Sequence, residues 1–392
     1  MLGNGVSRRG FVGGLAGALG AIGLAPDGSV LAETLLRPHA AKLPFLHGQE
    51  DYDSFAKLAN NENPYGPSEP VMRAMNGAWK YANRYGYPDG GIVDAIAEHH
   101  GVQPENVLLG AGSGEILEVV GLTYLDAGRK VIGVEPSYSQ VYRHATNIRA
   151  DAITLPLLDD YRQDIPAMID VTLRHHRDIG FVYLCNPNNP TGRTVTKQEV
   201  RQLLDGIPED VPVLIDEAYH HFVQDPTYAT SVPYVLEDRN VIVARTFSKI
   251  YGLAGMRLGY ALAPEPTVRR LRPFSTGSTS ALVKWGGVAA LADTESAERV
   301  RRVTLELRAR TTTRLQRLGY DVIPSEASFF MLHIRRPVEP VIEAFRERGV
   351  LVGRPFPPML EHLRVSVGTD EEMERFMVAF GDIFEVATAA GG

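Results

Sequence analysis

The sequence contains a single cysteine, Cys185, among 392 residues. One cysteine excludes an internal disulfide framework and any cysteine-rich zinc or iron–sulfur site. Cys185 follows the apolar run at residues 181–184. We therefore expect a buried thiol that packs as a small hydrophobic side chain rather than a catalytic one.

An excess of positive charge is also missing. The chain has 40 Lys and Arg against 47 Asp and Glu, which gives a net charge of −7. Such a chain lacks the broad basic surface that binds phosphate backbones, so nucleic acid is a poor candidate partner. The hydrophobic content of 44% and charged content of 22% are typical of a globular protein, and they exclude intrinsic disorder as the main state.

Metal-ligand patterns are missing as well. The eleven histidines, which include the pairs at 99–100, 175–176 and 220–221, show no ligand spacing matched by carboxylates at strand ends. We predict no metal site, and we expect the histidines at surface or edge positions.

The N-terminus carries a pattern that is set apart from the rest. Arg8 and Arg9 precede a weakly hydrophobic run, rich in Gly and Ala, that continues to about Pro26 without an acidic residue. This resembles a twin-arginine export signal, and the run is too short for a stable membrane span. We expect a periplasmic or exported protein. The alternative is a cytoplasmic protein whose loose N-terminal extension contains two arginines by accident.

The middle of the chain alternates short apolar runs with helical patterns. The runs lie at residues 106–109, 130–134, 180–185, 212–215, 240–244 and 258–262. Strands that are apolar on both faces belong in a sheet covered by helices on both sides. Thr196 opens one of the helices, with Glu199 completing a capping box. The pattern predicts an α/β fold with a mostly parallel sheet between helical layers.

The pattern changes near residue 295. A long charged amphipathic helix through 318 is followed by a β segment at 328–334 and helices near 338–348 and 370–388, which indicates a smaller α+β domain. The predicted regions are a signal-like segment at 1–32, an N-terminal arm and part of the small domain at 33–65, a large domain at 66–280 and a small C-terminal domain at 281–392.

Polar motifs follow the predicted strands directly. In open α/β sheets, ligands bind at the carboxyl ends of the strands. The glycine-rich turn at 110–114 opens a helix whose free backbone N–H groups can bind an anion. An Asn- and Pro-rich turn occupies 186–192, and later strand ends carry residues 216–219 and 245–249, with Arg257 beyond.

In this order and spacing, the motifs resemble those of fold-type I pyridoxal-phosphate enzymes, and specifically class I/II aminotransferases of the histidinol-phosphate aminotransferase kind. The resemblance covers residues 57–385, begins at 58–68, includes 87–89 and closes at 363–369. It implies pyridoxal 5'-phosphate as the cofactor, an amino donor and a 2-oxo acid acceptor as substrates, and a homodimer.

The resemblance also implies a role for each matching residue. Lys249 matches the lysine that forms a Schiff base with the cofactor and moves the substrate proton. Asp216 would keep the pyridine nitrogen protonated, and Asn189 and Tyr219 would bind the phenolate oxygen. The other cofactor-binding matches are Ser113, Gly114, Glu115, Thr246, Ser248 and Arg257 around the phosphate, Tyr138 stacked on the ring, and Tyr87 reaching the neighbouring subunit's phosphate.

The substrate is less narrowly specified. Arg364 matches the arginine that binds a substrate carboxylate or phosphate, and Asn63 and Tyr65 are further substrate-binding candidates. The family's second arginine is displaced, because Gly353 precedes Arg354. A serine, glycine and glutamate replace the commoner acidic pair at the phosphate loop. We therefore favour an aminotransferase for amino acids or related amines.

Three alternatives stay open. Histidinol-phosphate aminotransferase itself is the narrower one. The same scaffold also runs racemase, lyase and cyclase reactions, because fold does not determine function. A regulator built on an inactive aminotransferase domain is the non-enzyme alternative, and the intact pair of Asp216 and Lys249 argues against it.

Overall fold

The computed structural model describes residues 49–386, which belong to two units. The first unit ends at Ser54 and contributes one described helix, α3 (Gln49–Ser54); the second begins at Phe55 and contains every other element. The signal-like segment at 1–32 lies outside the described residues. Within 49–386, no helix is both long enough and apolar enough to cross a membrane.

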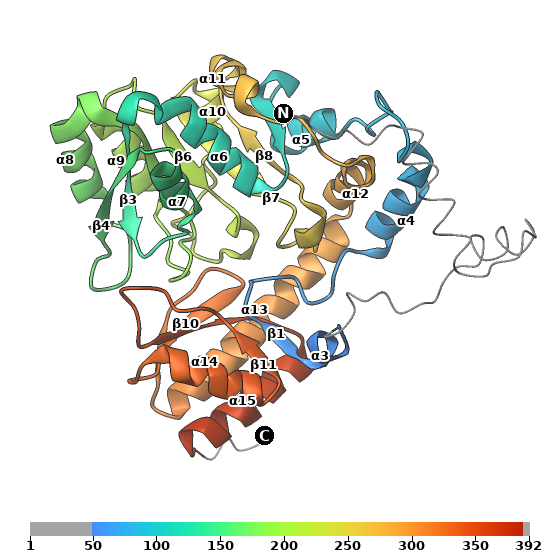
Figure 1. Cartoon of the computed structure of the whole chain (residues 1–392), viewed down its shortest axis with the longest axis vertical. Helices are drawn as coiled ribbons and strands as arrows, with labels where there is room; N and C mark the ends of the chain where they lie inside the picture. Colours follow the sequence, from blue (N-terminus) through green and yellow to red (C-terminus); the bar gives the residue numbers. More distant parts are fainter. Residues whose placement is uncertain (1–48, 387–392) are drawn as a thin grey trace, which may run out of the picture. The chain divides into compact units, whose positions relative to one another are not determined.

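A seven-stranded sheet forms the centre of the second unit (Figure 1). Its strands are β2 (Val107–Gly110), β3 (Lys130–Glu135), β4 (Asp151–Pro156), β5 (Ile179–Cys185), β6 (Val213–Asp216), β7 (Val241–Thr246) and β8 (Gly259–Leu262). Their order across the sheet is β2-β8-β7-β6-β5-β3-β4. Strand β8 pairs antiparallel with β2 and β7, and the remaining pairings are parallel. The carboxyl ends of β2, β5, β6 and β7 therefore meet at one edge.

Helices cover both faces of this sheet. One face carries α6 (Ser113–Tyr124), α7 (Gln140–Asn147) and α11 (Glu265–Leu271). The other carries α4 (Glu69–Ala78), α5 (Ile92–His100), α8 (Ile165–His175), α9 (Lys197–Gly206), α10 (Val232–Leu236) and α12 (Ala281–Ala292). Single-turn 3-10 helices lie in the connections: η2 (Trp79–Tyr81), η3 (Pro104–Asn106), η4 (Asp126–Gly128), η5 (His176–Asp178), η6 (His220–Phe222), η7 (Ala254–Met256) and η8 (Arg272–Phe274).

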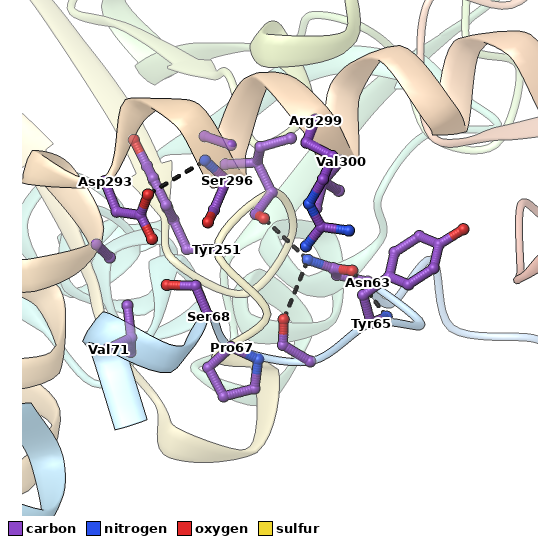
Figure 2. A pocket seen from close by; sticks show the side chains of 14 residues that line it. Asn63, Tyr65, Pro67, Ser68, Val71, Tyr251, Asp293, Ser296, Arg299 and Val300 are labelled. Carbon is purple, nitrogen blue, oxygen red and sulfur yellow. Dashed lines mark hydrogen bonds between the residues drawn. The ribbon is translucent and has the colours of Figure 1, made fainter. Parts of the chain in front are cut away.

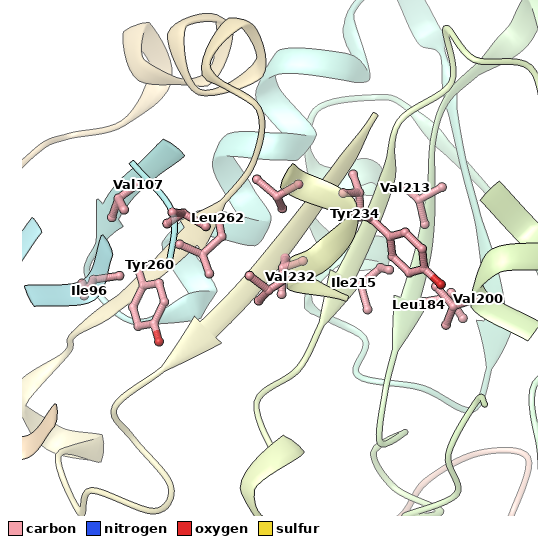
Figure 3. Packing of buried hydrophobic residues seen from close by; sticks show 14 of the residues in the cluster. Ile96, Val107, Leu184, Val200, Val213, Ile215, Val232, Tyr234, Tyr260 and Leu262 are labelled. Atoms are coloured by element: carbon pink, nitrogen blue, oxygen red, sulfur yellow. The ribbon is translucent and has the colours of Figure 1, made fainter. Parts of the chain in front are cut away.

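Successive residues of each central strand enter different cores. In β6, Val213 and Ile215 pack against α9 and α10, whereas Leu214 packs on the α6 side. Figure 3 shows the first of these cores, including Val213, Ile215 and Tyr234 of α10. Because side chains alternate across a strand, a strand buried on both faces must be apolar at every position. This is why the apolar runs identified these strands in the sequence.

A second core lies under smaller sheets. Antiparallel strands β9 (Asp321–Ile323), β10 (Phe329–His333) and β12 (His362–Ser366) form one, and β1 (Ala56–Leu58) pairs in parallel with β11 (Val350–Val352). Helices α13 (Thr294–Arg317), α14 (Val338–Glu347) and α15 (Asp370–Phe384) complete this part of the chain. Pairing with β11 places the N-terminal strand β1 beside residues 294 positions later, which brings residues 59–62 to the edge of the large sheet.

The predicted fold class is confirmed. All six apolar runs in the middle of the chain form strands within a few residues of the expected positions, the β segment at 328–334 forms β10, and Thr196 and Glu199 form the predicted capping box of α9. Strand β4 was not predicted. The domain boundaries stay predictions; the core of the large sheet includes Ala290 and Leu291 of α12.

Candidate active site

Two adjoining cavities lie at the edge where the strands end. The first, of about 180 Å³, is lined by Asn60, Glu62, Ser113, Gly114, Tyr138, Asn189, Asp216, Ala218, Tyr219, Thr246, Ser248, Lys249, Ala254 and Arg257. The second, of about 550 Å³, shares five of these residues and adds Ala59, Asn61, Ser137, Ile342, Val352, Arg354, Pro355, Phe356 and Arg364. We call them the inner and the outer cavity. Ten of the predicted cofactor-binding residues line the inner cavity.

One end of the inner cavity is built to bind an anion. Helix α6 begins at Ser113, its first two residues line the cavity, and Thr246, Ser248 and Arg257 add two hydroxyls and a guanidinium to the lining. Positive helix termini and guanidinium groups are the usual partners of phosphate in proteins.

Close backbone approach requires glycine at this end. Gly112 has φ 79°, and a Cβ there would lie 2.2 Å from a terminal nitrogen of Arg257. A Cβ on Gly259 of β8 would lie 2.3 Å from the amide nitrogen of Ser113. A side chain on Gly259 would collide with backbone atoms, and the positive φ of Gly112 strains any other residue, so both positions favour glycine.

Asp216 ends β6 and lines the inner cavity. Its side chain is 2% exposed, accepts a hydrogen bond from the amide of Ala218 at 3.1 Å, and has a long contact of 3.5 Å from the Tyr183 hydroxyl. Burial raises the pKa of this carboxyl to about 6. A buried carboxylate this poorly compensated favours a cationic or N–H partner in the cavity.

Lys249 lines both cavities. Its amine donates to the carbonyl of Asn60 at 3.1 Å. Burial lowers the pKa of Lys249 to about 8, with the positive charge of Arg364 adding to the effect and Glu62 and Asp216 opposing it. An amine with this pKa is far more available as a nucleophile or base near neutral pH than an exposed lysine.

Three side chains fix the wall between the two cavities. The Asn189 carbonyl oxygen accepts from Arg364 at 2.8 Å, which leaves the amide NH₂ group as its free donor. The Tyr219 hydroxyl accepts from Asn61 at 3.0 Å, and its ring packs edge-to-face on Phe329. The Tyr138 hydroxyl donates to Gln140 at 2.8 Å. Asn189 and Tyr219 thus present polar groups to the cavity, and Tyr138 presents a ring.

Arg364 holds a buried positive charge in the outer cavity. It is 6% exposed and donates to Asn189 and the carbonyl of Ala59, while its Nε has no hydrogen-bond partner. Burial lowers its pKa to about 10. Arg354 lies in the same cavity, and both guanidinium groups stack on Phe356, at 4.6 and 4.3 Å from the ring centre. Within residues 49–386, no carboxylate forms an ion pair with Arg364.

Four predicted site residues lie elsewhere. Glu115 turns away from the cavity and accepts hydrogen bonds from Ala111 and Thr276. The Tyr87 hydroxyl donates to the carbonyl of Thr279 at 2.8 Å. Asn63 and Tyr65 line a separate small pocket beside Asp293 and Arg299, where the Asn63 amide donates to Ile250 at 2.9 Å (Figure 2). Their proposed roles stay predictions.

Several lining residues were not singled out in the sequence. Asn60, Asn61 and Glu62 fall inside the stretch at 58–68 that carried the resemblance, but nothing in that stretch indicated that they face Lys249. Ile342, Val352 and Phe356 have ordinary core patterns. Their place in the site follows from the pairing of β1 with β11, which local sequence patterns do not reveal.

Cys185 is buried as predicted, whereas the expectation for the histidines is wrong in part. His175 is exposed. By contrast, His100, His220 and His221 are half-buried and line a cavity that also contains Arg245, whose guanidinium donates to His220. No group of three or more potential ligands within 49–386 is placed to hold a metal ion.

Comparison with known proteins shows to which family this chain belongs. Residues 54–380 match the family of class I and II aminotransferases. The chain belongs to this family. It is 38% identical to the histidinol-phosphate aminotransferase of Symbiobacterium thermophilum over 334 residues, covering 82% of this chain and 89% of that protein. The enzyme of the same name from Bdellovibrio bacteriovorus is 34% identical over 368 residues, with 90% and 97% covered.

A solved structure agrees with this aminotransferase assignment. The crystal structure of histidinol-phosphate aminotransferase from Sinorhizobium meliloti in complex with pyridoxal-5'-phosphate has a TM-score of 0.78 and 25% identity, and covers 89% of this chain and 97% of that one. The chain is a pyridoxal-phosphate-dependent aminotransferase.

The inner cavity fits this cofactor. Its anion-binding end suits the phosphate, and the poorly compensated Asp216 carboxylate suits a protonated pyridine nitrogen. Asn189 and Tyr219 would face the phenolate oxygen, and the Lys249 amine would face the aldehyde carbon. Every functional group of the cofactor therefore has a complementary residue in the cavity.

Proposed function

We propose that this aminotransferase acts on amino donors that carry an acidic group, and that Arg364 binds that group. The observation that carries the proposal is the buried Arg364 guanidinium, which faces the outer cavity with one unpartnered nitrogen and no ion-pair partner among the described residues. A buried cation in this state favours an anionic ligand, because the ligand restores the interaction with charge that burial removed.

The residues of the chain divide the reaction between them. Bound pyridoxal phosphate supplies an electron sink for the pair of electrons left when the amino donor's α-carbon loses its proton. The Lys249 amine, close to the wall shared by both cavities, holds the cofactor at rest and takes that proton. Asp216 keeps a proton on the pyridine nitrogen, and Arg364 orients the amino donor by its acidic group.

The nature of the acidic group narrows the substrate. The relatives from Symbiobacterium thermophilum and Bdellovibrio bacteriovorus are named for histidinol phosphate, whose acidic group is a phosphate. Two arginines in the outer cavity are compatible with a phosphate or with an amino-acid carboxylate. We favour α-amino acids, because the interposed Gly353 displaces the family's second arginine to position 354, where Arg354 stacks on Phe356. Histidinol phosphate is the second candidate, supported by the named relatives.

Arginine-to-lysine variants test the proposal. Lysine supplies charge without the planar fork, so Arg364→Lys should lower kcat/KM for α-amino acids by roughly ten- to a thousand-fold and leave amines without an acidic group almost unaffected. Arg354→Lys is the matched control. A larger loss on histidinol phosphate than on any amino acid, in a native enzyme that prefers it, would favour the second candidate. An equal response of acidic and neutral amines would rule out Arg364 as the binding group.

The family resemblance supports a homodimer in which Tyr87 reaches the cofactor phosphate of the neighbouring subunit. Tyr87 does not line the inner cavity of its own subunit, as this role requires. Sedimentation of the holoenzyme should give a dimer, and Tyr87→Phe should weaken cofactor binding. A monomer with a full complement of active cofactor would exclude the proposal.

Export through the twin-arginine route is the proposed localisation, supported by Arg8 and Arg9 before an apolar run. Changing both to lysine keeps the charge but removes the guanidinium pair, so the protein should stay in the cytoplasm. Equal amounts of both versions outside the cytoplasm, or none of either, would refute export without affecting the enzymatic assignment.

A further inference from the structure

A buried arginine lies directly behind the active site. Arg245 is 3% exposed and immediately precedes Thr246, which lines the inner cavity. Its side chain points to the opposite side of β7, into a cavity of about 400 Å³, here called the rear cavity, that is lined by His220, His221 and residues of helices α12 and α13. The mechanism described above uses no group of this rear cavity.

The guanidinium of Arg245 binds one segment of chain at two points. Its Nε and one terminal nitrogen donate to the Glu217 carboxylate at 3.1 and 2.6 Å. The other terminal nitrogen donates to His220 Nε2. Glu217 and His220 flank Ala218 and Tyr219, and Asp216 precedes them. Thus Asp216, Ala218 and Tyr219, which line the inner cavity, alternate along the chain with the two residues that bind Arg245.

Backbone pairing stops just where these contacts begin. Strands β6 and β7 are paired up to Asp216 and Ala244, and the last backbone bond runs from the amide of Glu217 to the carbonyl of Ala244 at 3.0 Å. Beyond this point the two segments separate to enclose the inner cavity. The Arg245 side chain is therefore what connects them after the ladder ends.

Other groups complete the same network. The Thr230 hydroxyl accepts from Arg245 at 2.7 Å and donates to Glu217 at 3.0 Å, and the amide of Ser231 donates to Glu217 at 2.6 Å. The Glu217 carboxylate is fully buried, so each of these bonds satisfies charge that water cannot reach.

The histidine contact has a defined chemical form. A guanidinium can only donate, so His220 Nε2 must accept, and the imidazole is neutral with its proton on Nδ1. Burial, with the charge of Arg245 as the next cause, holds the pKa of His220 well below its usual range. The contact is therefore a hydrogen bond to a neutral ring, which fixes position without adding charge.

We propose that Arg245 is a positioning residue of the transamination reaction, and that its guanidinium fastens the segment carrying Asp216 and Tyr219 to the segment carrying Thr246 and Lys249. The inference rests on the proposed roles of Asp216 and Lys249. We call these contacts of Arg245 with Glu217 and His220 the clamp. Without the clamp, both segments keep their secondary structure, but the distance between Asp216 and Lys249 is no longer fixed. Misplacement of about 1 Å can lower the rate roughly a hundredfold.

Substitutions of His220 distinguish a positioning role from a role in stability better than substitutions of Arg245 do. Removal of Arg245 would also destabilise the fold, because the buried Glu217 carboxylate would lose its ion-pair partner. His220→Phe removes the acceptor, and His220→Gln keeps one in the amide oxygen. His221→Phe is the matched control: the His221 ring packs against His220 at a 40° tilt with ring centres 3.7 Å apart and lines the same cavity, but its Nδ1 has no partner.

The experiment compares the three variants as holoenzymes. We expect His220→Phe to lower kcat by about ten-fold or more with the KM of the amino donor nearly unchanged, and to shift the pH midpoint of the bound cofactor's visible absorption, with a melting temperature near that of His221→Phe. His220→Gln should lie within about threefold of the native kcat, and His221→Phe should match it.

Two results would contradict the proposal that Arg245 positions the two segments. One is a native kcat and native absorption midpoint in His220→Phe. The other is an equal loss in His220→Phe and His221→Phe that parallels their melting temperatures, which would mean the cavity contributes stability only. If the native enzyme transaminates no amino donor, the proposed function is wrong. The absorption midpoints of the variants then still test whether Arg245 positions the two segments.

Discussion

At the residue scale, burial shifts the pKa values of Lys249 and Asp216 in opposite directions. It lowers the pKa of the lysine to about 8 and raises that of the aspartate to about 6. Both shifts disfavour the charged form, and both are what a cavity designed to receive a charged ligand shows before the ligand binds.

The lysine shift predicts how cofactor attachment depends on pH. Only the neutral amine attacks an aldehyde, so the attachment rate should rise about tenfold per pH unit up to about 8 and then level off. Arg364→Met removes a positive charge that lowers the pKa of Lys249 and should move the midpoint up. Glu62→Gln removes a negative charge that raises it and should move the midpoint down. Stopped-flow absorbance with cofactor-free protein measures both, and midpoints that move in the same direction would contradict the assignment.

The raised pKa of Asp216 predicts that replacing this residue stabilises the cofactor-free protein but slows the cofactor-bound enzyme. Because the folded-state pKa of Asp216 lies above its unfolded value, ionisation of Asp216 costs stability in the cofactor-free protein above about pH 6 and costs nothing below about pH 4. A pKa near 6 against a usual value near 4 corresponds to about 3 kcal/mol. Asp216→Asn should therefore stabilise the cofactor-free protein at pH 8 by up to that amount, with no gain near pH 4.

With cofactor bound, the same substitution should instead lower kcat strongly, because a neutral partner no longer keeps the pyridine nitrogen protonated. Urea unfolding at several pH values gives the first quantity, and single-turnover rates give the second. A cofactor-free Asp216→Asn protein that is less stable than native at pH 8 would show that the carboxylate is compensated in some other way.

At the element scale, the anion-binding end depends on contact between β8 and the start of α6. Gly259→Ala would place a methyl group 2.3 Å from the Ser113 amide nitrogen, so the turn must move away from the cavity. We expect cofactor affinity to fall by at least about tenfold. Gly255→Ala, where a Cβ meets nothing within 4 Å, is the matched control and should bind cofactor as the native protein does. Equal affinities in a titration of the two variants would exclude this account of the turn.

The elements also show why sequence reasoning succeeded where it did. Strands β5, β6 and β7 are buried on both faces and read as continuous apolar runs. Strand β4 lies at the edge of the sheet with exposed residues, so the run at 151–156 lacks that pattern and was missed. The capping box of α9 was predictable because its hydrogen bonds join residues only three apart.

At the scale of the whole molecule, long-range pairing limits what the sequence predicts. Asp216 ends β6, Lys249 lies three residues after β7 and Arg257 lies two residues before β8, and the resemblance placed them in order. The residues at 59–62 reach the site only through the pairing of β1 with β11, and the Arg245 network forms behind strands that local patterns cannot place side by side. The outer cavity, where we propose that the substrate's acidic group binds, is therefore the part that local sequence patterns did not predict.

The most direct test of the central claim, amino-group transfer through Lys249, is a half-reaction followed by absorbance. Purified holoenzyme is mixed with an acidic amino donor without any acceptor, and then with a 2-oxo acid. We predict that the absorption band of the lysine-bound cofactor disappears with the amino donor and returns with the 2-oxo acid, and that Lys249→Ala shows neither change at a measurable rate. A native band that no amino donor alters, or a Lys249→Ala protein that completes the cycle at the native rate, would contradict the account.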